Sequence, residues 1–391
     1  MASFTLSKEE YQLVQEVYDL AVTQISERAS YLDSQDVDKP DYVIPELLAK
    51  KNLLSPIIPE KYGGRGLSMV VTANVIEKLA MGDAGAAATV VMNTYAVTPL
   101  LVAGSDELKD ALLPTLCETT RPHFACTAIS ETNPYFDLER SQAVREDVTR
   151  IDTTAEYLEG NIIINGSKDF VLNGGVADFI VVFARSKESK RKSHLQFYVV
   201  PDNTPGVTVD AVLNKVGMRS CHTVQLGFRD VVIPEEYRIG GRSGGYLLLL
   251  QTFDRNLPLI GAVGVGIARG AYELALEAAR SQMILGSGKD ASQFVDFTLA
   301  DMSTQIDAAR LAVLRAAYSI DIDGNYSRVA IMAKLFATQV AQQVTAQAVD
   351  IIGRLGFIAG HPIDKYLRDA QMLSIVAGSD HLHRQVLSQQ L

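Results

Sequence analysis

The sequence predicts an α+β fold in three parts: a helical domain, a small β domain and a second helical domain. From Lys8 onward, apolar residues recur at three- and four-residue steps, the spacing of one helical face. Short β-prone runs separated by turn residues follow, and the helical period returns from Gly244. We therefore expect domains at residues 1–122, 123–240 and 241–391.

The first domain is predicted to contain several helices. The first begins at Lys8 and presents an apolar face of Tyr11, Val14, Tyr18, Ala21 and Ile25. Loops rich in proline and glycine separate it from later segments. These later helices are expected at residues 45–51, 68–81, 86–103 and 106–117.

The β domain and the last domain are predicted from a change of period. Strands are expected around residues 162–164, 179–184, 197–200 and 224–228. The basic segment 187–192 lies between two of them and indicates a solvated hairpin loop. Gly324-Asn325 then separates two long helices, as in a four-helix bundle. One of these helices has a clear apolar stripe at Leu299, Met302, Ile306, Ala309 and Val313.

Composition narrows the class of protein. The 391 residues are 47% hydrophobic, enough to fill a sizeable core. The formal net charge of −10 repels nucleic acid and anionic membranes, so neither partner is expected. Three cysteines without metal-ligand spacing predict no metal site and favour a reducing compartment. The N-terminus has no apolar signal core and no uninterrupted 18-residue apolar run occurs, so we expect a cytoplasmic protein.

Several segments resemble motifs of the acyl-CoA dehydrogenase family. Residues 165–175, NGSKDFVLNGG, are similar to N-G-x-K-x-W-I-T-N-G. Residues 216–223 and 228–234 resemble G-x-R-S-x-x-T and F-x-D-V-x-V-P, and the bundle contributes Phe253-Asp254 and the segments 299–302 and 366–370. The matches occur in the family's order and cover nearly the whole chain.

This resemblance implies a helical N-terminal domain, a central β-barrel-like domain and a C-terminal four-helix bundle, usually assembled as a homotetramer. It also implies FAD bound between the β domain and the bundle, partly by a neighbouring subunit of a tetramer or dimer. In the family a glutamate removes the α-proton of an acyl thioester on CoA or an acyl carrier protein. The β-hydrogen leaves as hydride to the flavin, because the flavin is an electron sink.

The usual catalytic base is missing from the sequence. The glutamate of the family motif Y-E-G-T corresponds to Ala377, and a methyl group accepts no proton. The alternative glutamate position on the first long helix of the bundle is Asn256, followed by Leu257 where arginine is common. The resemblance places Asp254, Asn256 and Leu257 at the substrate. The catalytic base is therefore unknown, with Asp380 as the fallback proton acceptor.

The flavin-binding segments also depart from the family. The motif T-E-P-G-A-G-S-D becomes Ser130 to Asp137, in which Pro134 removes a donor. Tyr135 and Phe136 put bulk where glycine and serine are usual, and Phe136 is predicted to contact substrate. This pattern allows either a reshaped pocket that keeps FAD or a lost site for flavin or thioester. The resemblance assigns cofactor contacts to Ile129, Ser130, Phe170, Val171, Leu172, Ser379 and His381.

The segments that bridge subunits carry altered charges. The family arginine of R-x-x-F-G is Gln282, whereas Gln293 matches the pattern. The motif Q-x-x-G-G becomes Asp350 to Arg354, with Gly353 retained. Gln282, Gln293, Asp350, Gly353 and Arg354 are all expected at the cofactor. Gln282 removes a positive charge, Asp350 adds a negative charge and Arg354 adds a positive charge. Arg354 would either replace the missing charge at the FAD diphosphate or pair with Asp350 and block the site.

Three functions stay open at the level of sequence. The first is a flavoprotein oxidoreductase that acts on an unusual acyl thioester with a relocated base. The second is a flavin-dependent oxygenase or oxidase, and the third is a flavin-free isomerase, dehydratase or non-catalytic subunit on the same fold. Visible absorbance of the purified protein separates the third from the other two.

Overall fold

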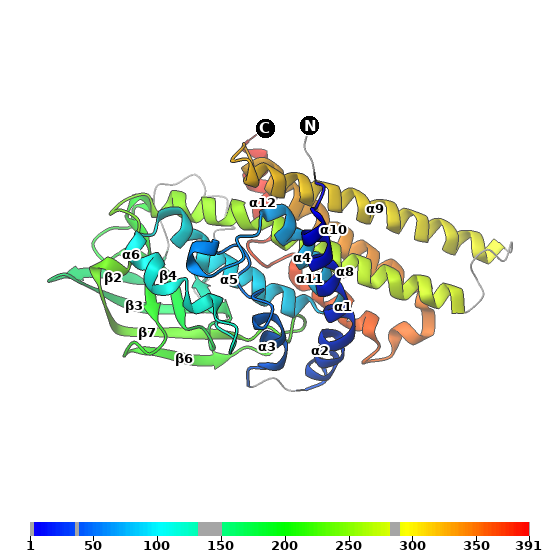
Figure 1. Ribbon diagram of the computed structural model, residues 1–391, viewed down its shortest axis with the longest axis horizontal. Coiled ribbons are helices and arrows are strands. Elements are labelled where there is room, and N and C mark those ends of the chain that lie inside the picture. Colours follow the sequence, from blue (N-terminus) through cyan, green and yellow to red (C-terminus); the bar gives the residue numbers. More distant parts are fainter. Residues whose placement is uncertain (1–3, 36–38, 132–150, 282–289, 391) are drawn as a thin grey trace.

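The computed structural model describes residues 4–35, 39–131, 151–281 and 290–390. Figure 1 shows the sheet at one end of the molecule and the long helices extending to the other end, with the N-terminal helices against both. The predicted sequence of helical, β and helical parts is confirmed. The change from helix to strand falls between Cys117 and Ala125, and the change back falls between Ile239 and Gly245.

The N-terminal part begins with a reciprocal cap. Ser7 accepts from the Glu10 backbone N–H while the Glu10 carboxylate accepts from the Ser7 N–H, which satisfies two otherwise free donors at the helix start. A helix was predicted from 106 through 117 and this was wrong. It ends at Leu112 because Pro114 follows, and a short 3₁₀ turn covers Thr115–Cys117. The helices are α1 Lys8–Leu20, α2 Ser26–Asp33, α3 Val43–Ala49, α4 Met69–Gly82, α5 Ala84–Ala103 and α6 Asp106–Leu112, with a π-helical turn between α1 and α2.

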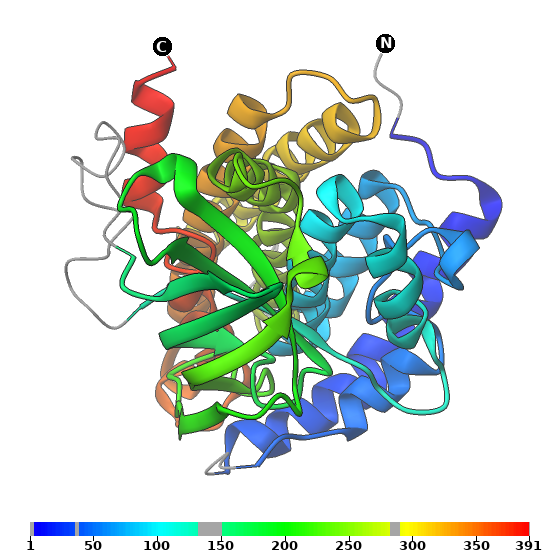
Figure 2. The same cartoon turned by 90° about the vertical axis from the view of Figure 1, so that its left-hand side faces the viewer.

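The β domain is one sheet with the strand order β6-β7-β3-β2-β4-β5-β8, and β1 pairs with β4 beside β2. Figure 2 shows the strands in front of the helices. Residues 179–184 of the central β4 are all buried, as expected for a strand covered on both faces. The basic loop lies between β4 and β5, as predicted. The strands are β1 Ala125–Ala128, β2 Thr154–Leu158, β3 Asn161–Leu172, β4 Phe179–Ser186, β5 Leu195–Pro201, β6 Val207–Val212, β7 Thr223–Pro234 and β8 Arg238–Ile239.

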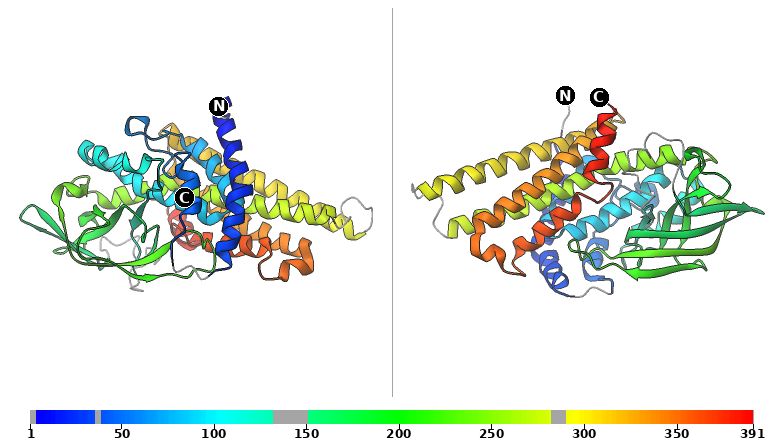
Figure 3. Two further views of the ribbon diagram at one scale, coloured as in Figure 1. Left: turned by 60° about the horizontal axis from the view of Figure 1, so that its bottom comes forward. Right: turned by 180° about the vertical axis from the view of Figure 1, so that it is seen from behind.

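The C-terminal part consists of α8 Gly245–Ser281, α9 Asp290–Asp321, α10 Ser327–Ile352, α11 Pro362–Leu373 and α12 Asp380–Ser388. The two views in Figure 3 show the long helices running side by side. The predicted break at Gly324-Asn325 separates α9 from α10, and the predicted α9 stripe is buried. Two helices, α5 and α8, have windows apolar and long enough to cross a membrane, but 83% and 72% of these windows are buried inside the protein. They are core helices of the fold.

A buried ion-pair cluster joins the three parts. Lys365 of α11 lies 2.6 Å from Asp83 and 2.6 Å from Asp369. Asp83 caps α5 through the Ala86 N–H and also accepts from Ser220 of the β domain. Burial alone would lower the pKa of Lys365, but the carboxylates of Asp369 and Asp83 outweigh burial and raise the pKa. The ammonium is therefore held charged in the interior.

Candidate active site

The two positions predicted for a catalytic base, Asn256 and Ala377, lie in the C-terminal part of the chain. Asn256 is buried on α8, and its neighbour Leu257 packs in one hydrophobic cluster with Ala377. Ala377 lies in the turn between α11 and α12 with a φ of +56°. Neither side chain accepts a proton. Neither of the two predicted base positions therefore carries a carboxylate.

Lys334 of α10 holds this turn in place. Its buried ammonium donates to the carbonyls of Ser374 at 3.5 Å and Gly378 at 3.0 Å, and to the Asp380 carboxylate at 2.7 Å. Asp380 is therefore engaged by a cation. Ser379 caps α12 by accepting from the Leu382 N–H. Because the Lys334 ammonium already occupies the Asp380 carboxylate, this arrangement argues against Asp380 as the proton acceptor.

His383 supports the same turn. Its ring is buried, and Nε2 lies 3.0 Å from the carbonyl oxygen of Ala377. Burial and the nearby Lys334 ammonium lower the pKa of His383 to about 4, so the ring is neutral at pH 7. His381, predicted to contact the cofactor, is exposed two residues earlier.

The sequence reasoning missed both Lys334 and His383. A signal existed for Lys334, because it occupies the buried face of α10 with apolar neighbours at helical spacing: Ala330, Ile331, Ala337 and Ala341. Lysine at such a position requires partners. For His383 no comparable pattern was present.

A polar contact joins α5 and α8 beside the turn. The Asn256 amide donates from Nδ2 to Thr98 Oγ1 at 2.9 Å and to the Thr252 carbonyl at 2.8 Å. Tyr95 lies three residues before Thr98 on α5, and Phe253 lies three residues before Asn256 on α8. The rings of Tyr95 and Phe253 meet edge to face with centroids 5.8 Å apart. Tyr95 and Ala377 pack in the same large hydrophobic cluster as Leu172 of β3.

Asp254 lies beside this contact. Burial raises the pKa of Asp254, and a hydrogen bond with Ser327 partly offsets the effect. Burial and the negative charge of Asp254 together raise the pKa of Tyr95 well above its usual value. The phenol of Tyr95 is therefore a neutral O–H group near a carboxylate.

The predicted flavin-edge segment is shaped by a β-bulge. The pairing of β3 with β7 shifts between Lys168 and Val171, so β3 carries an extra residue there. Phe170 adopts a φ of +53° and the residue is 65% exposed, whereas Val171 is buried in the sheet core. Phe170, Val171 and Leu172 are the three residues predicted to line the flavin edge. Phe170 presents its side chain outward and Leu172 is half-buried.

A buried ion pair fixes the strand next to the bulge. Lys168 Nζ donates to the Ile129 carbonyl at 2.9 Å and to Glu131 at 2.8 Å. The Asp169 N–H donates to the Ser130 carbonyl at 2.9 Å. These contacts hold Ile129 and Ser130 beside Phe170, and Ser130 is exposed.

The predicted bridging residues lie elsewhere. Figure 1 shows the start of α9 and the end of α10 at the end of the bundle away from the sheet. Gln293, Asp350 and Arg354 are exposed, and no ion pair joins Asp350 to Arg354 in the part of the chain that is described. Gly353 has a φ of +68° with open space around it. Gln282 and Phe136 lie outside the described residues.

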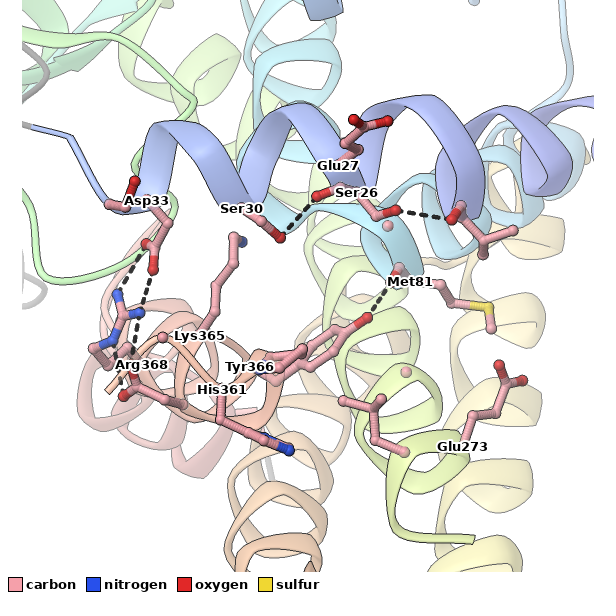
Figure 4. Close-up of a pocket in the computed structure, with 18 of the residues that line it drawn as sticks. Ser26, Glu27, Ser30, Asp33, Met81, Glu273, His361, Lys365, Tyr366 and Arg368 are labelled. Carbon is pink, nitrogen blue, oxygen red and sulfur yellow. Dashed lines mark hydrogen bonds and ion pairs between the residues drawn. The ribbon is translucent and has the colours of Figure 1, made fainter. Parts of the chain in front are cut away.

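A cavity of about 850 Å³ lies apart from these positions, between α1, α2, α8 and α11. Figure 4 shows its polar lining, in which Arg368 pairs with Asp33 at 2.5 Å and Tyr366 donates to the Met81 carbonyl. None of the residues predicted for the site lines this cavity. Across the described segments, no group of three or more His, Cys, Asp or Glu side chains is placed to hold a metal ion.

Comparison with known proteins matches three family models: the N-terminal, middle and C-terminal domains of acyl-CoA dehydrogenase, over residues 7–120, 140–231 and 243–391. The chain belongs to the acyl-CoA dehydrogenase family. It is 32% identical to cyclohex-1-ene-1-carbonyl-CoA dehydrogenase of Geobacter metallireducens over 389 residues, covering 99% of this chain and 98% of that protein. This family member is accordingly a flavoprotein oxidoreductase of the type that acts on CH–CH groups.

Solved structures of the acyl-CoA dehydrogenase fold superimpose over the whole chain. Butyryl-CoA dehydrogenase of Megasphaera elsdenii has a TM-score of 0.90 at 27% identity, with 99% of each chain covered. A prolyl acyl carrier protein oxidase has a TM-score of 0.86 at 22% identity, again with 99% of each covered, and shows the fold alone. The helical, β and helical parts are therefore those of the acyl-CoA dehydrogenase fold.

Proposed function

We propose that this protein oxidises an unusual acyl thioester, carried by CoA or an acyl carrier protein, with FAD as cofactor and without the glutamate base of its relatives. The observation that carries the proposal is the combination of a preserved scaffold with Asn256 and Ala377 at the two base positions. FAD, when bound, supplies the electron sink for hydride. Free buried cysteines are consistent with the reducing cytoplasm we propose as its location.

The residues present fit a flavin. The bulge at Phe170 presents an exposed aromatic ring, and the exposed Ser130 is held beside it. At the far end of the bundle, the open Gly353 allows close approach of a diphosphate, and the exposed Arg354 offers a guanidinium fork. Ser130, Phe170 and Leu172 would hold one part of the cofactor, and Gln293, Gly353 and Arg354 the other.

The start of α9 and the end of α10 lie away from the sheet that carries Phe170, which supports a cofactor shared between two copies of the chain. Leu355, Phe357 and Ile358 follow Arg354 and are more than half exposed, which suits a surface covered by another subunit. We therefore propose a homo-oligomer, a dimer or a tetramer, in which each cofactor contacts both partners.

The turn that contains Ala377 is held in place by two side chains. Lys334 and His383 fix the carbonyls and backbone of the turn at Ala377 and Gly378. Because Asp380 is held by Lys334, no carboxylate is free at this turn to take the α-proton. The substrate must therefore have a more acidic C–H than a plain acyl chain, or lose its proton to a group outside the turn.

The test begins with visible absorbance of the purified protein, which should show bound flavin. Wild-type protein should turn over straight-chain acyl-CoAs poorly, and Ala377→Glu should raise that turnover by ~100-fold, because it restores a base. Residue 377 already has a positive φ with a Cβ, so the change adds no backbone strain of that kind. Ala377→Gln is the matched control, with similar size and no basic group.

The outcomes separate the alternatives. A colourless protein that takes up no added FAD would exclude the flavoprotein functions and support the flavin-free alternative. Rapid wild-type turnover of straight-chain acyl-CoAs would contradict the argument from the missing base. Equal gains from Ala377→Glu and Ala377→Gln would show that side-chain size, not basicity, was limiting.

A further inference from the structure

The contact between α5 and α8 contains two buried polar atoms without a partner. Asn256 Oδ1 and the Tyr95 hydroxyl are both shielded from solvent and accept or donate no hydrogen bond within the described chain. Asn256 is 1% exposed and Tyr95 is 3% exposed. A buried polar atom without a partner costs stability, so such atoms require an explanation. Other buried polar atoms also lack partners, but these two belong to one helix contact at the predicted substrate position.

The hydrogen-bond network fixes the orientation of the Asn256 amide. Thr98 donates its hydroxyl proton to the Thr94 carbonyl at 2.7 Å, so Thr98 Oγ1 can only accept from Asn256. The Thr252 carbonyl is also an acceptor. Both neighbours therefore require the NH₂ side of the amide, and flipping Asn256 would place oxygen against oxygen twice. Oδ1 is consequently committed as an acceptor, and no residue of the described segments donates to it.

Tyr95 contributes the second buried polar atom of this helix contact. Tyr95 and Thr98 are three residues apart on α5, and Phe253 and Asn256 are three apart on α8, so each pair shares one helix face. The edge-to-face rings and the Asn256–Thr98 hydrogen bond bring the two faces together. A plain alkyl chain in this place would leave both polar atoms unpaired.

We propose that the acyl group of the substrate carries an O–H or N–H group that donates to Asn256 Oδ1 and hydrogen-bonds with the Tyr95 hydroxyl. The inference rests on the proposed function, since it takes the α5–α8 contact as the wall of the acyl site. Asn256 then selects substrates instead of removing a proton. A hydroxyl and an amine satisfy the same acceptor, and the test distinguishes them.

The test measures binding without turnover. Non-reactive thioether analogues of butanoyl-CoA, unsubstituted, hydroxyl-substituted and amino-substituted, are titrated into the holoenzyme by calorimetry. We expect one substituted analogue to bind about 10- to 100-fold more tightly than the unsubstituted one, the range that a single unpaired or paired polar contact spans. The stronger of the two identifies the donor as hydroxyl or amine.

Variants assign the effect to the two residues. Asn256→Leu should bring the ratio between substituted and unsubstituted analogues close to one, and Tyr95→Phe should lower it partly. Tyr95→Phe removes an unpaired buried hydroxyl, so it should fold at least as well as wild type. Tyr198→Phe, a buried tyrosine of β5, is the control and should leave the ratio unchanged.

Equal binding of all three analogues by wild type would overturn the inference, whether or not the variants fold. An unchanged ratio in both folded variants would also overturn it. Failure of the proposed function looks different: a protein without flavin that binds no acyl-CoA analogue at all. Flavin binding with indifferent analogue binding would reject the polar substrate and leave the oxidoreductase intact.

Discussion

The cluster around Lys365 and the contact around Asn256 both contain buried polar groups, but they differ in whether these groups have partners among the described residues. Lys365 is a largely buried cation with two buried carboxylates at 2.6 Å, and it joins three parts of the fold. Asn256 is more fully buried, but its oxygen has no donor among the described residues. In a low-dielectric interior, paired groups stabilise one arrangement whereas an unpaired group destabilises it until a ligand supplies the partner. The first region is therefore scaffold, and the second is available for recognition.

The largest expected effect is a loss of stability when the Lys365 cluster is disrupted. Lys365→Met should lower the free energy of unfolding by about 3 to 5 kcal/mol, because it leaves the Asp83 and Asp369 carboxylates buried side by side without a cation. Urea unfolding followed by circular dichroism measures it. Lys187→Met is the control: its pair with Glu156 is exposed, so the loss should stay below about 1 kcal/mol. Similar losses in both variants would refute the special role of the cluster.

A second prediction concerns the turn that borders the site. His383 has an ordinary pKa of 6.5 that folding lowers to about 4, so the unfolded state binds a proton more readily. Its contribution is fully present above pH 6.5 and is lost as pH falls toward 4, by about 3 kcal/mol in total. Urea unfolding at several pH values should show this loss for wild type and a smaller loss for His383→Gln. His381→Gln, the exposed neighbour, should behave as wild type, and an identical pH profile for His383→Gln would contradict the assignment.

The smallest effect concerns the exposed end of the bundle. Arg354 has no ion-pair partner in the described segments, so Arg354→Ala should weaken FAD retention by ~1.5 to 3 kcal/mol without lowering the melting temperature of the apoprotein. Arg354→Lys should lose part of this, because lysine lacks the fork. Arg191→Ala in the β4–β5 loop is the control, and flavin titration followed by fluorescence measures all three. Unchanged flavin affinity in Arg354→Ala would remove Arg354 from the cofactor site.

Periodicity and motifs predicted many of the secondary-structure elements, because these elements depend on residues that are near one another in the sequence. The α9 stripe from Leu299 to Val313, the break at Gly324-Asn325 and the change from helix to strand near residue 123 were all visible in the sequence. Each depends on neighbours within a few residues, where the helix and strand periods apply. The overextended helix after Asp106 was wrong for a local reason too, since the effect of Pro114 was not weighed.

The sequence by itself also predicted that Ala377 and Asn256 stand where the resemblance places a base, and residue identity alone determined that neither side chain is a carboxylate. Only the tertiary structure decided which groups surround them. Lys334 reaches Asp380 across 46 residues of sequence, and Asn256 reaches Thr98 across 158. Whether a buried amide is satisfied or open depends on partners from distant segments, and no local pattern encodes which segments will meet.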